Sequence, residues 1–173
     1  YVWFIEEKKL LISTLVLLIV IAIIIELLRN HKNFINNIFN QYLTSILRES
    51  ESNGKITGAT WLLISYVITI ITFPKPIAIA ALIFLSVGDS VAAIVGKIIP
   101  IFPIGEKNIT GFIGGVITSY LVVLSLNQDL QNSVIFLGAV AAMTIEILPI
   151  RINDNLTIPL FSGLVMVIFN SIL

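Results

Sequence analysis

The feature that most constrains this sequence is a series of apolar segments whose lengths match the thickness of a lipid bilayer. A helix needs about 20 consecutive apolar residues to cross a hydrocarbon core of about 30 Å. Polar residues and prolines divide the sequence into six segments of about this size, at 10–28, 56–73, 76–98, 111–126, 133–150 and 156–173. We therefore predict an all-α fold, a polytopic transmembrane helical bundle with six spans in a single integral membrane domain, 1–173.

Composition supports a membrane protein and excludes several other classes. Hydrophobic residues make up 57% of the 173 residues and charged residues 12%, whereas soluble domains carry about 25% charged residues. The formal net charge is +0, so no basic face is expected for nucleic-acid phosphates, and we predict no nucleic-acid partner. With no cysteine and one histidine, the chain has the residues for neither a disulfide framework nor a Cys/His zinc site.

Residues 33–48 differ from the predicted spans. Here apolar residues recur at helical spacing, and asparagine, glutamine and serine occupy the opposite face. This pattern predicts an amphipathic helix that lies in the membrane interface. The same periodicity is also compatible with a core helix of a water-exposed region.

The distribution of lysine and arginine predicts the orientation of the spans. The loops after the first, third and fifth spans share one side of the membrane and carry seven of the ten basic residues. The positive-inside rule places this side in the cytoplasm. We therefore expect a multi-pass protein of the cell membrane in a prokaryote, or of the endoplasmic reticulum in a eukaryote.

Three carboxylates fall within predicted spans, where each costs about 2.5–3.5 kcal/mol on insertion scales. Asp89 lies deep in the third span among small residues, and we predict a functional role for it. Glu146 lies near the end of the fifth span, where it could serve a site or pair with Arg151. Glu26 lies close to Arg29, and an interfacial ion pair explains it best.

Two polar stretches outside the spans carry further candidates. The sequence RINDN at 151–155 offers carboxylate and amide oxygens that suit Mg²⁺, although Asp and Asn are also favoured helix caps. The loop 97–109 places lysines ahead of a helix N-terminus, an arrangement that suits a phosphate chain. Gly111 and Gly115 form a GxxxG pair, whose usual meaning is close helix packing.

These candidates gather at one predicted membrane face. They are Asp89 in the third span, Lys107 in the loop that follows, Glu146 at the end of the fifth span, Asp154 before the sixth, and Arg48 with Glu51 before the second. Carboxylates for Mg²⁺, cations for phosphate and a lipid-facing cavity would converge there. Such a combination indicates an enzyme that joins a water-soluble nucleotide to a lipid.

Four sequence blocks follow one another from about Arg48 onward and cover most of the chain. They are Arg48 and Glu51 with TGAT at 57–60; GDSVAA at 88–93 with Gly96; KNITG at 107–111 before a glycine-rich helix; and Glu146 with DNLTIPL at 154–160. Together they resemble the CTP-dependent lipid kinases, the family of dolichol kinase, phytol kinase and yeast-type diacylglycerol kinase. That family is related more distantly to phosphatidate cytidylyltransferase.

The resemblance implies transfer of a phosphoryl group from CTP to a long-chain isoprenoid alcohol, with Mg²⁺ or another divalent cation. The implied catalytic residues are Asp89, Asp154 and Lys107, and the two aspartates are the implied metal ligands. The implied nucleotide and phosphate ligands are Gly88, Ser90, Gly96, Lys97, Lys107, Gly111 and Arg48, with Glu51, Glu146 and Asn155 in support. The sequence leaves open which aspartate is the base, which lipid alcohol is bound and the oligomeric state.

The sequence departs from the family pattern at two places. The family's Lys-Ser/Thr-x-Glu-Gly is replaced by KNITG at 107–111, which lacks the carboxylate and has an amide in place of the hydroxyl. Family members also carry an upstream helix with an Arg-Lys pair and a histidine, and we expect this seventh span to precede the sequence. Two alternatives to the kinase are a CTP-dependent cytidylyltransferase that makes a CDP-lipid, and a small transporter in which Asp89 and Glu146 line an ion path.

Overall fold

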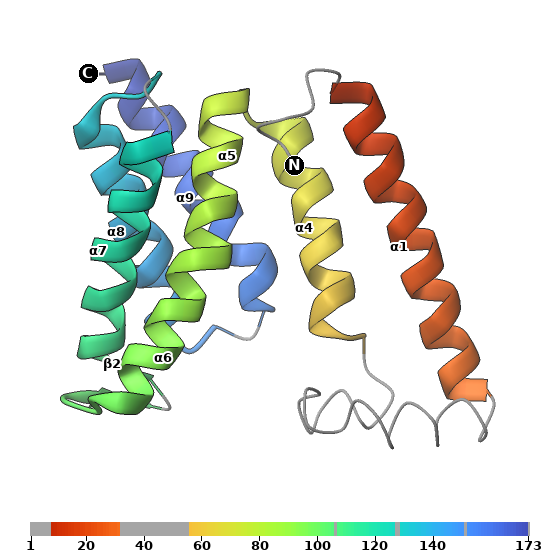
Figure 1. Ribbon diagram of the computed structural model, residues 1–173, viewed down its shortest axis with the longest axis horizontal. Helices are drawn as coiled ribbons and strands as arrows, with labels where there is room; N and C mark the ends of the chain where they lie inside the picture. Colours follow the sequence, from red (N-terminus) through yellow and green to blue (C-terminus); the bar gives the residue numbers. More distant parts are fainter. Residues whose placement is uncertain (1–7, 32–55, 106, 127–128, 151, 173) are drawn as a thin grey trace.

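The fold is a bundle of antiparallel helices with a short β-hairpin at its end (Figure 1). The computed structural model describes residues 8–31, 56–105, 107–126, 129–150 and 152–172. Its elements are α1 (Lys8–His31), α4 (Gly58–Thr72), α5 (Lys75–Ile83), the π-helix η1 (Phe84–Asp89), α6 (Ser90–Ile98), β1 (Pro103–Ile104), β2 (Lys107–Asn108), α7 (Ile109–Leu126), α8 (Asn132–Ile147) and α9 (Asp154–Ile172). The prediction of an all-α fold is confirmed for the described residues, apart from the hairpin.

All of the predicted spans are helical, but they differ in length. Among the described residues, four helical segments are long and apolar enough to cross a membrane: Lys8–Leu28, Lys75–Ile98, Ile109–Leu126 and Asp154–Ile172. Helices α4 and α8 are apolar but shorter, with 15 and 16 residues. The amphipathic helix predicted at 33–48 lies outside the described residues.

Prolines end α4 and α8 earlier than predicted. Phe73 and Leu148 each precede a proline and have extended backbone, with ψ of 152° and 139°. A proline ring disfavours helical conformation in the residue before it. The predicted spans 56–73 and 133–150 are therefore longer than the helices that form.

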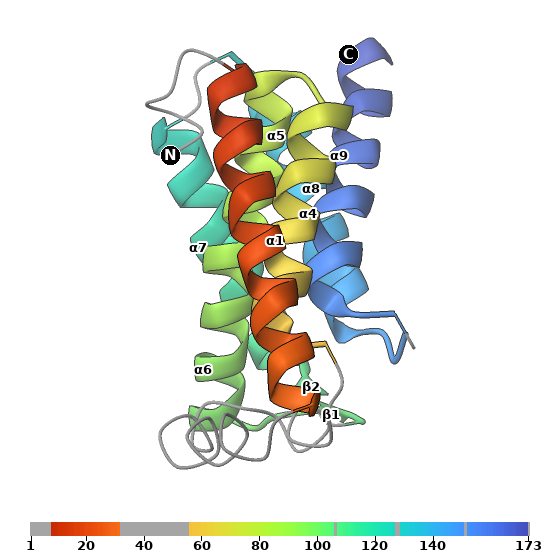
Figure 2. The same cartoon turned by 90° about the vertical axis from the view of Figure 1, so that its right-hand side faces the viewer.

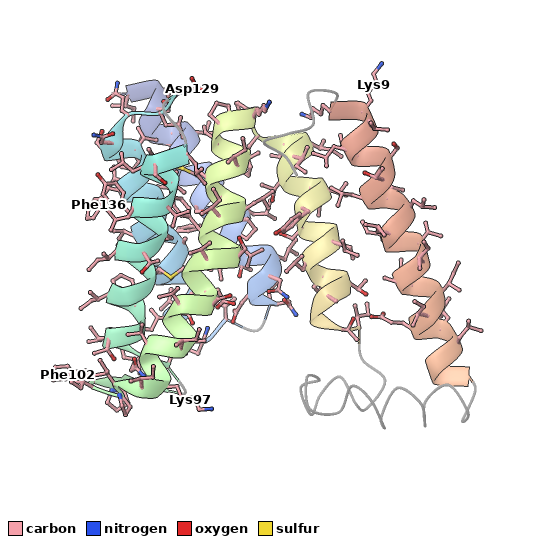
Figure 3. All side chains as sticks on the ribbon, in the orientation of Figure 1. Lys9, Lys97, Phe102, Asp129 and Phe136 are labelled. Atoms are coloured by element: carbon pink, nitrogen blue, oxygen red, sulfur yellow. The ribbon has the colours of Figure 1, made fainter. Side chains whose placement is uncertain are left out.

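The segments α5, η1 and α6 form one continuous rod, and with this rod counted as one unit, successive helices run in opposite directions (Figures 1 and 2). Alternate connections therefore lie at the same end of the bundle. We call the end that holds β1 and β2 the hairpin end. Figure 3 shows Lys97 and Phe102 at this end, and Lys9 and Asp129 at the opposite end. The alternation of loops assumed for the predicted spans is thus present in the described helices.

Large side chains from α8, α9 and η1 form the centre of the bundle. Phe84, Ile135, Met143, Ile158 and Met166 are each less than 2% exposed. Helix α1 packs against α4 and leaves most of its leucines, isoleucines and valines exposed. An outward apolar surface of this kind suits a helix that faces lipid.

The π-helical segment η1 joins α5 to α6 within the predicted third span. Such segments are rare, occur mostly as single turns inside α-helices, and are frequent at functional sites. Asp89 is the last residue of η1. The irregular turn therefore falls at the residue that the sequence marks as the strongest candidate.

The β-hairpin was not included in the all-α prediction. Strands β1 and β2 pair antiparallel, with Ile104 opposite Lys107. Gly105 begins the turn with φ of 63°, in the left-handed region that glycine adopts without strain. The hairpin therefore holds Lys107 in a strand next to the start of α7.

Candidate functional site

A cavity of about 390 Å³ opens at the hairpin end, where α6, α7, α8 and α9 meet β2. Its lining residues are Asp89, Ala92, Ala93, Gly96, Lys97, Lys107, Asn108, Gly111, Phe112, Glu146 and Asp154. Three carboxylates and two lysines thus stand in a wall that is otherwise made mainly of small and apolar residues. The volume lies within the range of pockets that bind small molecules.

Lys107 lies between two carboxylates in this wall. Its Nζ is 3.1 Å from Oε1 of Glu146 and 3.0 Å from Oδ2 of Asp154, and it also donates a hydrogen bond to the backbone carbonyl of Glu146. The side chains of Lys107, Glu146 and Asp154 are 32%, 7% and 24% exposed. A carboxylate as buried as Glu146 is costly unless it is paired, and Lys107 supplies the positive charge. The side chain of Arg151, the partner predicted as an alternative, is outside the described part.

Two opposing effects act on the pKa of Lys107. Burial lowers this pKa, but the hydrogen bond to Asp154 and the negative charges of Glu146 and Asp154 outweigh burial. The net result is a pKa above the ordinary value of 10.5. The amine therefore stays protonated at neutral pH, as a group that binds phosphate or holds carboxylates must.

The carboxylates of the cavity fit a divalent cation that also contacts phosphate. Asp89 comes from the end of η1 and Asp154 from the first residue of α9, and both line the cavity. Mg²⁺ is commonly bound through one or two carboxylates together with substrate phosphate oxygens. Within the described residues no group of three or more His, Cys, Asp or Glu is arranged to hold a metal by itself. The donor set suits a cation that arrives with a phosphorylated ligand.

Asn108, the residue after Lys107, forms hydrogen bonds with both α6 and α7. Oδ1 of Asn108 accepts hydrogen bonds from the N–H of Gly111 and the hydroxyl of Thr110, both at 2.8 Å. Nδ2 donates to the carbonyl of Gly96 at 2.7 Å. Asparagine caps a helix N-terminus as well as serine or threonine does. Asn108 therefore caps the start of α7 and connects it to α6.

The GxxxG pair in α7 marks close helix packing, as predicted. A Cβ atom added to Gly111 would lie 2.5 Å from the backbone carbonyl oxygen of Ala92, and one added to Gly115 would lie 2.9 Å from that of Gly88. Both glycines therefore let α7 approach α6 and η1 at backbone distance. This packing places Lys107 and Asn108, just ahead of α7, against the cavity.

The start of α9 confirms the predicted capping role of the RINDN stretch. Oδ1 of Asn153 accepts a hydrogen bond from the N–H of Asn155, and the carbonyl of Asn153 accepts from Leu156 and Thr157. Nδ2 of Asn155 donates to the carbonyl of Gly58 at 2.9 Å. Asn155 thus connects α9 to α4 and is absent from the cavity wall, whereas Asp154 is directed to Lys107.

Glu26 has a role that the sequence did not suggest. Its Oε1 accepts hydrogen bonds of 2.8 Å from the N–H and hydroxyl of Thr57 and from the hydroxyl of Thr60. The carboxylate therefore binds the N-terminus of α4, where the helix dipole favours negative charge. The predicted pair with Arg29 cannot be compared, because that side chain is outside the described part. The signal in the sequence was the pair of threonines in TGAT at 57–60, whose hydroxyls are buried in the structure.

The predicted site residues divide into three groups. Those that line the cavity together are Asp89, Gly96, Lys97, Lys107, Gly111, Glu146 and Asp154. Gly88 packs against Met143 and Ser119, and the hydroxyl of Ser90 donates to the carbonyl of Ser86, so neither is part of the wall, and Asn155 is also absent from it. Arg48 and Glu51 lie outside the described residues.

Fold and cavity define a helical protein with several helices able to cross a membrane and a charged cavity at one end of the bundle. No family model and no solved structure matches the chain. A protein of Rickettsia prowazekii (strain Madrid E), described as uncharacterized, is 29% identical over 161 residues, which is 88% of this chain and 79% of the relative. The similarity extends over most of both chains and assigns no activity.

Proposed function

We propose that this protein is a CTP-dependent kinase that phosphorylates a membrane isoprenoid alcohol of the dolichol or polyprenol type at the cytoplasmic face. The observation that carries the proposal is the placement of Lys107 between Glu146 and Asp154 in a cavity that also contains Asp89. Apolar helices end at this cavity, so a nucleotide from water and an alcohol in lipid can meet there.

The reaction requires little covalent participation of the protein. The alcohol oxygen forms a bond to the γ-phosphorus of CTP, the bond from that phosphorus to the β–γ bridging oxygen breaks, and CDP leaves. The hydroxyl proton passes to a cavity carboxylate, either Asp89 or Asp154. Such a transfer depends on positioning and on the neutralisation of charge at the phosphate oxygens.

Each charged residue of the cavity has a role in this reaction. Lys107 and Lys97 supply positive charge for the phosphates, and Glu146 holds Lys107 in place from its buried position. Asp89 and Asp154 would hold Mg²⁺, which neutralises negative charge on the phosphate oxygens when it is bound. Asn108 and Gly111 keep the wall of the cavity close to α6.

The deciding experiment is transfer of ³²P from γ-labelled CTP to lipid by the purified full chain in mixed micelles. Polyprenol, phytol and diacylglycerol are offered separately, and Asp89→Asn is compared with Asp129→Asn. Asp129 is exposed at the opposite end of the bundle and provides the matched control (Figure 3). We expect label in one alcohol, a loss of about 10²–10⁴-fold in Asp89→Asn, and no change in Asp129→Asn.

The label position distinguishes the alternatives. Phosphatidic acid is offered separately with α-labelled CTP; label that appears in CDP-diacylglycerol, with release of pyrophosphate, would replace the kinase by a cytidylyltransferase. Failure of both labels to enter any lipid would contradict both enzymes and favour a transporter, in which the carboxylates bind a passing cation.

A further inference from the structure

Residues 98–104 form an exposed apolar segment at the hairpin end. The segment reads IIPIFPI, and each of its residues is exposed. Ile98 is 71% exposed and Phe102 is 69% exposed. The segment begins at Ile98, the last residue of α6, and continues into β1, so it follows directly on the helix that carries Lys97 in the cavity wall.

The backbone holds this segment in one defined conformation. Phe102 has φ of 53°, in the left-handed region that residues other than glycine, asparagine and aspartate rarely adopt. The carbonyl of Phe102 accepts a hydrogen bond from the N–H of Ile109, and the carbonyl of Ile99 accepts one from Ile101. An unfavourable backbone conformation that leaves a large aromatic side chain exposed indicates that the outward position of Phe102 has a function.

The apolar segment is continuous with the outward surface of α6 and α7. Ile94 and Ile98 are exposed one turn apart on α6, and Ile113 and Ile117 are exposed one turn apart on α7. Figure 1 shows the hairpin lying across the foot of α6 and α7 rather than continuing along their axes, and Figure 3 shows Phe102 projecting there. The surface that suits lipid on these helices therefore extends around the end of the bundle.

We infer that residues 98–104 insert into the headgroup–acyl boundary of the membrane leaflet beside the cavity. Contiguous exposed apolar side chains are rare on surfaces that face water, whereas aromatic and aliphatic side chains are stabilised at this boundary. Ile104 in β1 is paired with Lys107 in β2, so the inserted strand is hydrogen-bonded to the strand that carries the cavity lysine. Insertion thus sets the depth of the cavity relative to the lipid headgroups. This last consequence rests on the proposed function.

The insertion can be measured without any assay of activity. The chain contains no cysteine, so Phe102→Cys, Ile117→Cys and Asp129→Cys each provide a single attachment site for a nitroxide label. Power saturation with oxygen and with a water-soluble nickel chelate then reports the depth of each label in phosphatidylcholine–phosphatidylglycerol vesicles. We expect the label at 117 to be deep, the label at 129 to be in water, and the label at 102 to lie between them at the boundary.

Two outcomes would overturn the inference. The label at 102 could be as accessible to the nickel chelate as the label at 129, which would place the segment in water. It could instead be immobilised and inaccessible to both reagents, which would indicate a contact with protein.

The functional consequence has its own measurement. Ile98→Ser with Phe102→Ser should raise KM for the lipid alcohol about fivefold and leave KM for CTP unchanged, because only the lipid-facing contact is removed. Leu126→Ser, on the exposed surface at the opposite end of α7, is the matched control. Equal changes in the double variant and the control would refute the link to depth. Absence of kinase activity in the wild type would refute the kinase and leave the depth measurement as an independent result.

Discussion

Oδ2 of Asp154 lies 3.0 Å from Nζ of Lys107, although the two residues are 47 positions apart in the sequence. The same ammonium pairs with Glu146 at 3.1 Å, so one side chain connects β2 to both α8 and α9. Because Glu146 is 7% exposed, loss of the ammonium would leave a buried charge without this partner. The stability of the hairpin end should therefore depend on Lys107.

Lys107→Met should lower the free energy of unfolding by about 1–3 kcal/mol. A fully buried ion pair that loses one partner costs about 3–5 kcal/mol, and the cost here is smaller because Lys107 is 32% exposed. The measurement is the unfolding free energy in mixed micelles, titrated with sodium dodecyl sulfate and followed by circular dichroism.

Two further variants show whether the loss comes from the pairing. Lys75→Met, at the exposed start of α5 at the opposite end, should leave the free energy unchanged. Lys107→Met combined with Glu146→Gln should recover most of the loss, because the buried charge is removed together with its partner. Losses that simply add in the double variant would show that the two side chains act independently.

The stability of the wild type should also fall at high pH. Burial lowers the pKa of Lys107, but Asp154 and Glu146 raise it further, so it lies above its ordinary value of 10.5 in the folded state. The stabilisation from such a group is fully present below the pKa that the group has in the unfolded state. It is lost as the pH rises through the pKa of the folded state. Lys107 should therefore add nothing to the pH dependence of the unfolding free energy below pH 10.5. Above pH 10.5 the unfolding free energy should decline.

Lys107→Arg is the control for this pH dependence. The guanidinium stays charged to a pKa above about 12, so the decline should be reduced in this variant. An identical decline in both proteins would assign the effect to other groups.

The sequence predicted the apolar helices because apolar length is a local property of the chain. It also predicted that Asp89, Lys107, Glu146 and Asp154 lie at one end, because alternating spans bring alternate loops together. The particular pairs were not predictable, since they depend on how neighbouring helices are rotated and shifted along their axes. Glu146 illustrates this point, because the residue close to it in sequence is Arg151, whereas its observed partner, Lys107, comes from another loop.

The irregular elements were missed for a related reason. The π-helical turn at η1 and the hairpin of β1 and β2 depend on hydrogen bonds whose partners have no periodic signature. Asn108 shows the converse case. Its capping of α7 follows from a preference of asparagine that can be read in the sequence, but the hydrogen bond from its amide to the carbonyl of Gly96 depends on how α6 packs against α7.

Gly111→Ala should lower the free energy of unfolding by about 1–3 kcal/mol, the usual cost of overpacking. The new Cβ would lie 2.5 Å from a backbone oxygen of Ala92, so α6 and α7 must separate. Gly114→Ala is the matched control on the same helix, because its Cβ would meet side-chain atoms of Val95 at 3.1 Å, which need to move much less. Phosphoryl transfer should fall only in Gly111→Ala, since Gly111 lines the cavity. Equal stability of the two variants would show that the helices are not closely packed at this position.

Glu26 should be necessary for the attachment of α1 to α4. Its carboxylate accepts three hydrogen bonds of 2.8 Å from Thr57 and Thr60, and it faces the N-terminus of α4, where the helix dipole favours negative charge. Glu26→Ala should therefore lower the free energy of unfolding by about 2–3 kcal/mol, and Glu26→Gln by less, because the amide oxygen still accepts. Ser13→Ala, which removes only a hydroxyl bonded within α1, should have little effect.

A double-mutant cycle between Glu26→Ala and Thr60→Val separates this contact from general effects on α1. The hydroxyl of Thr60 is buried and donates to Glu26, so each substitution removes the same hydrogen bond. The combined loss should be smaller than the sum of the single losses by about 1 kcal/mol, measured by the same titration in mixed micelles. A coupling of zero would mean that Thr60 does not share a hydrogen bond with Glu26, and that only Thr57 and the packing of apolar side chains hold α1 to α4.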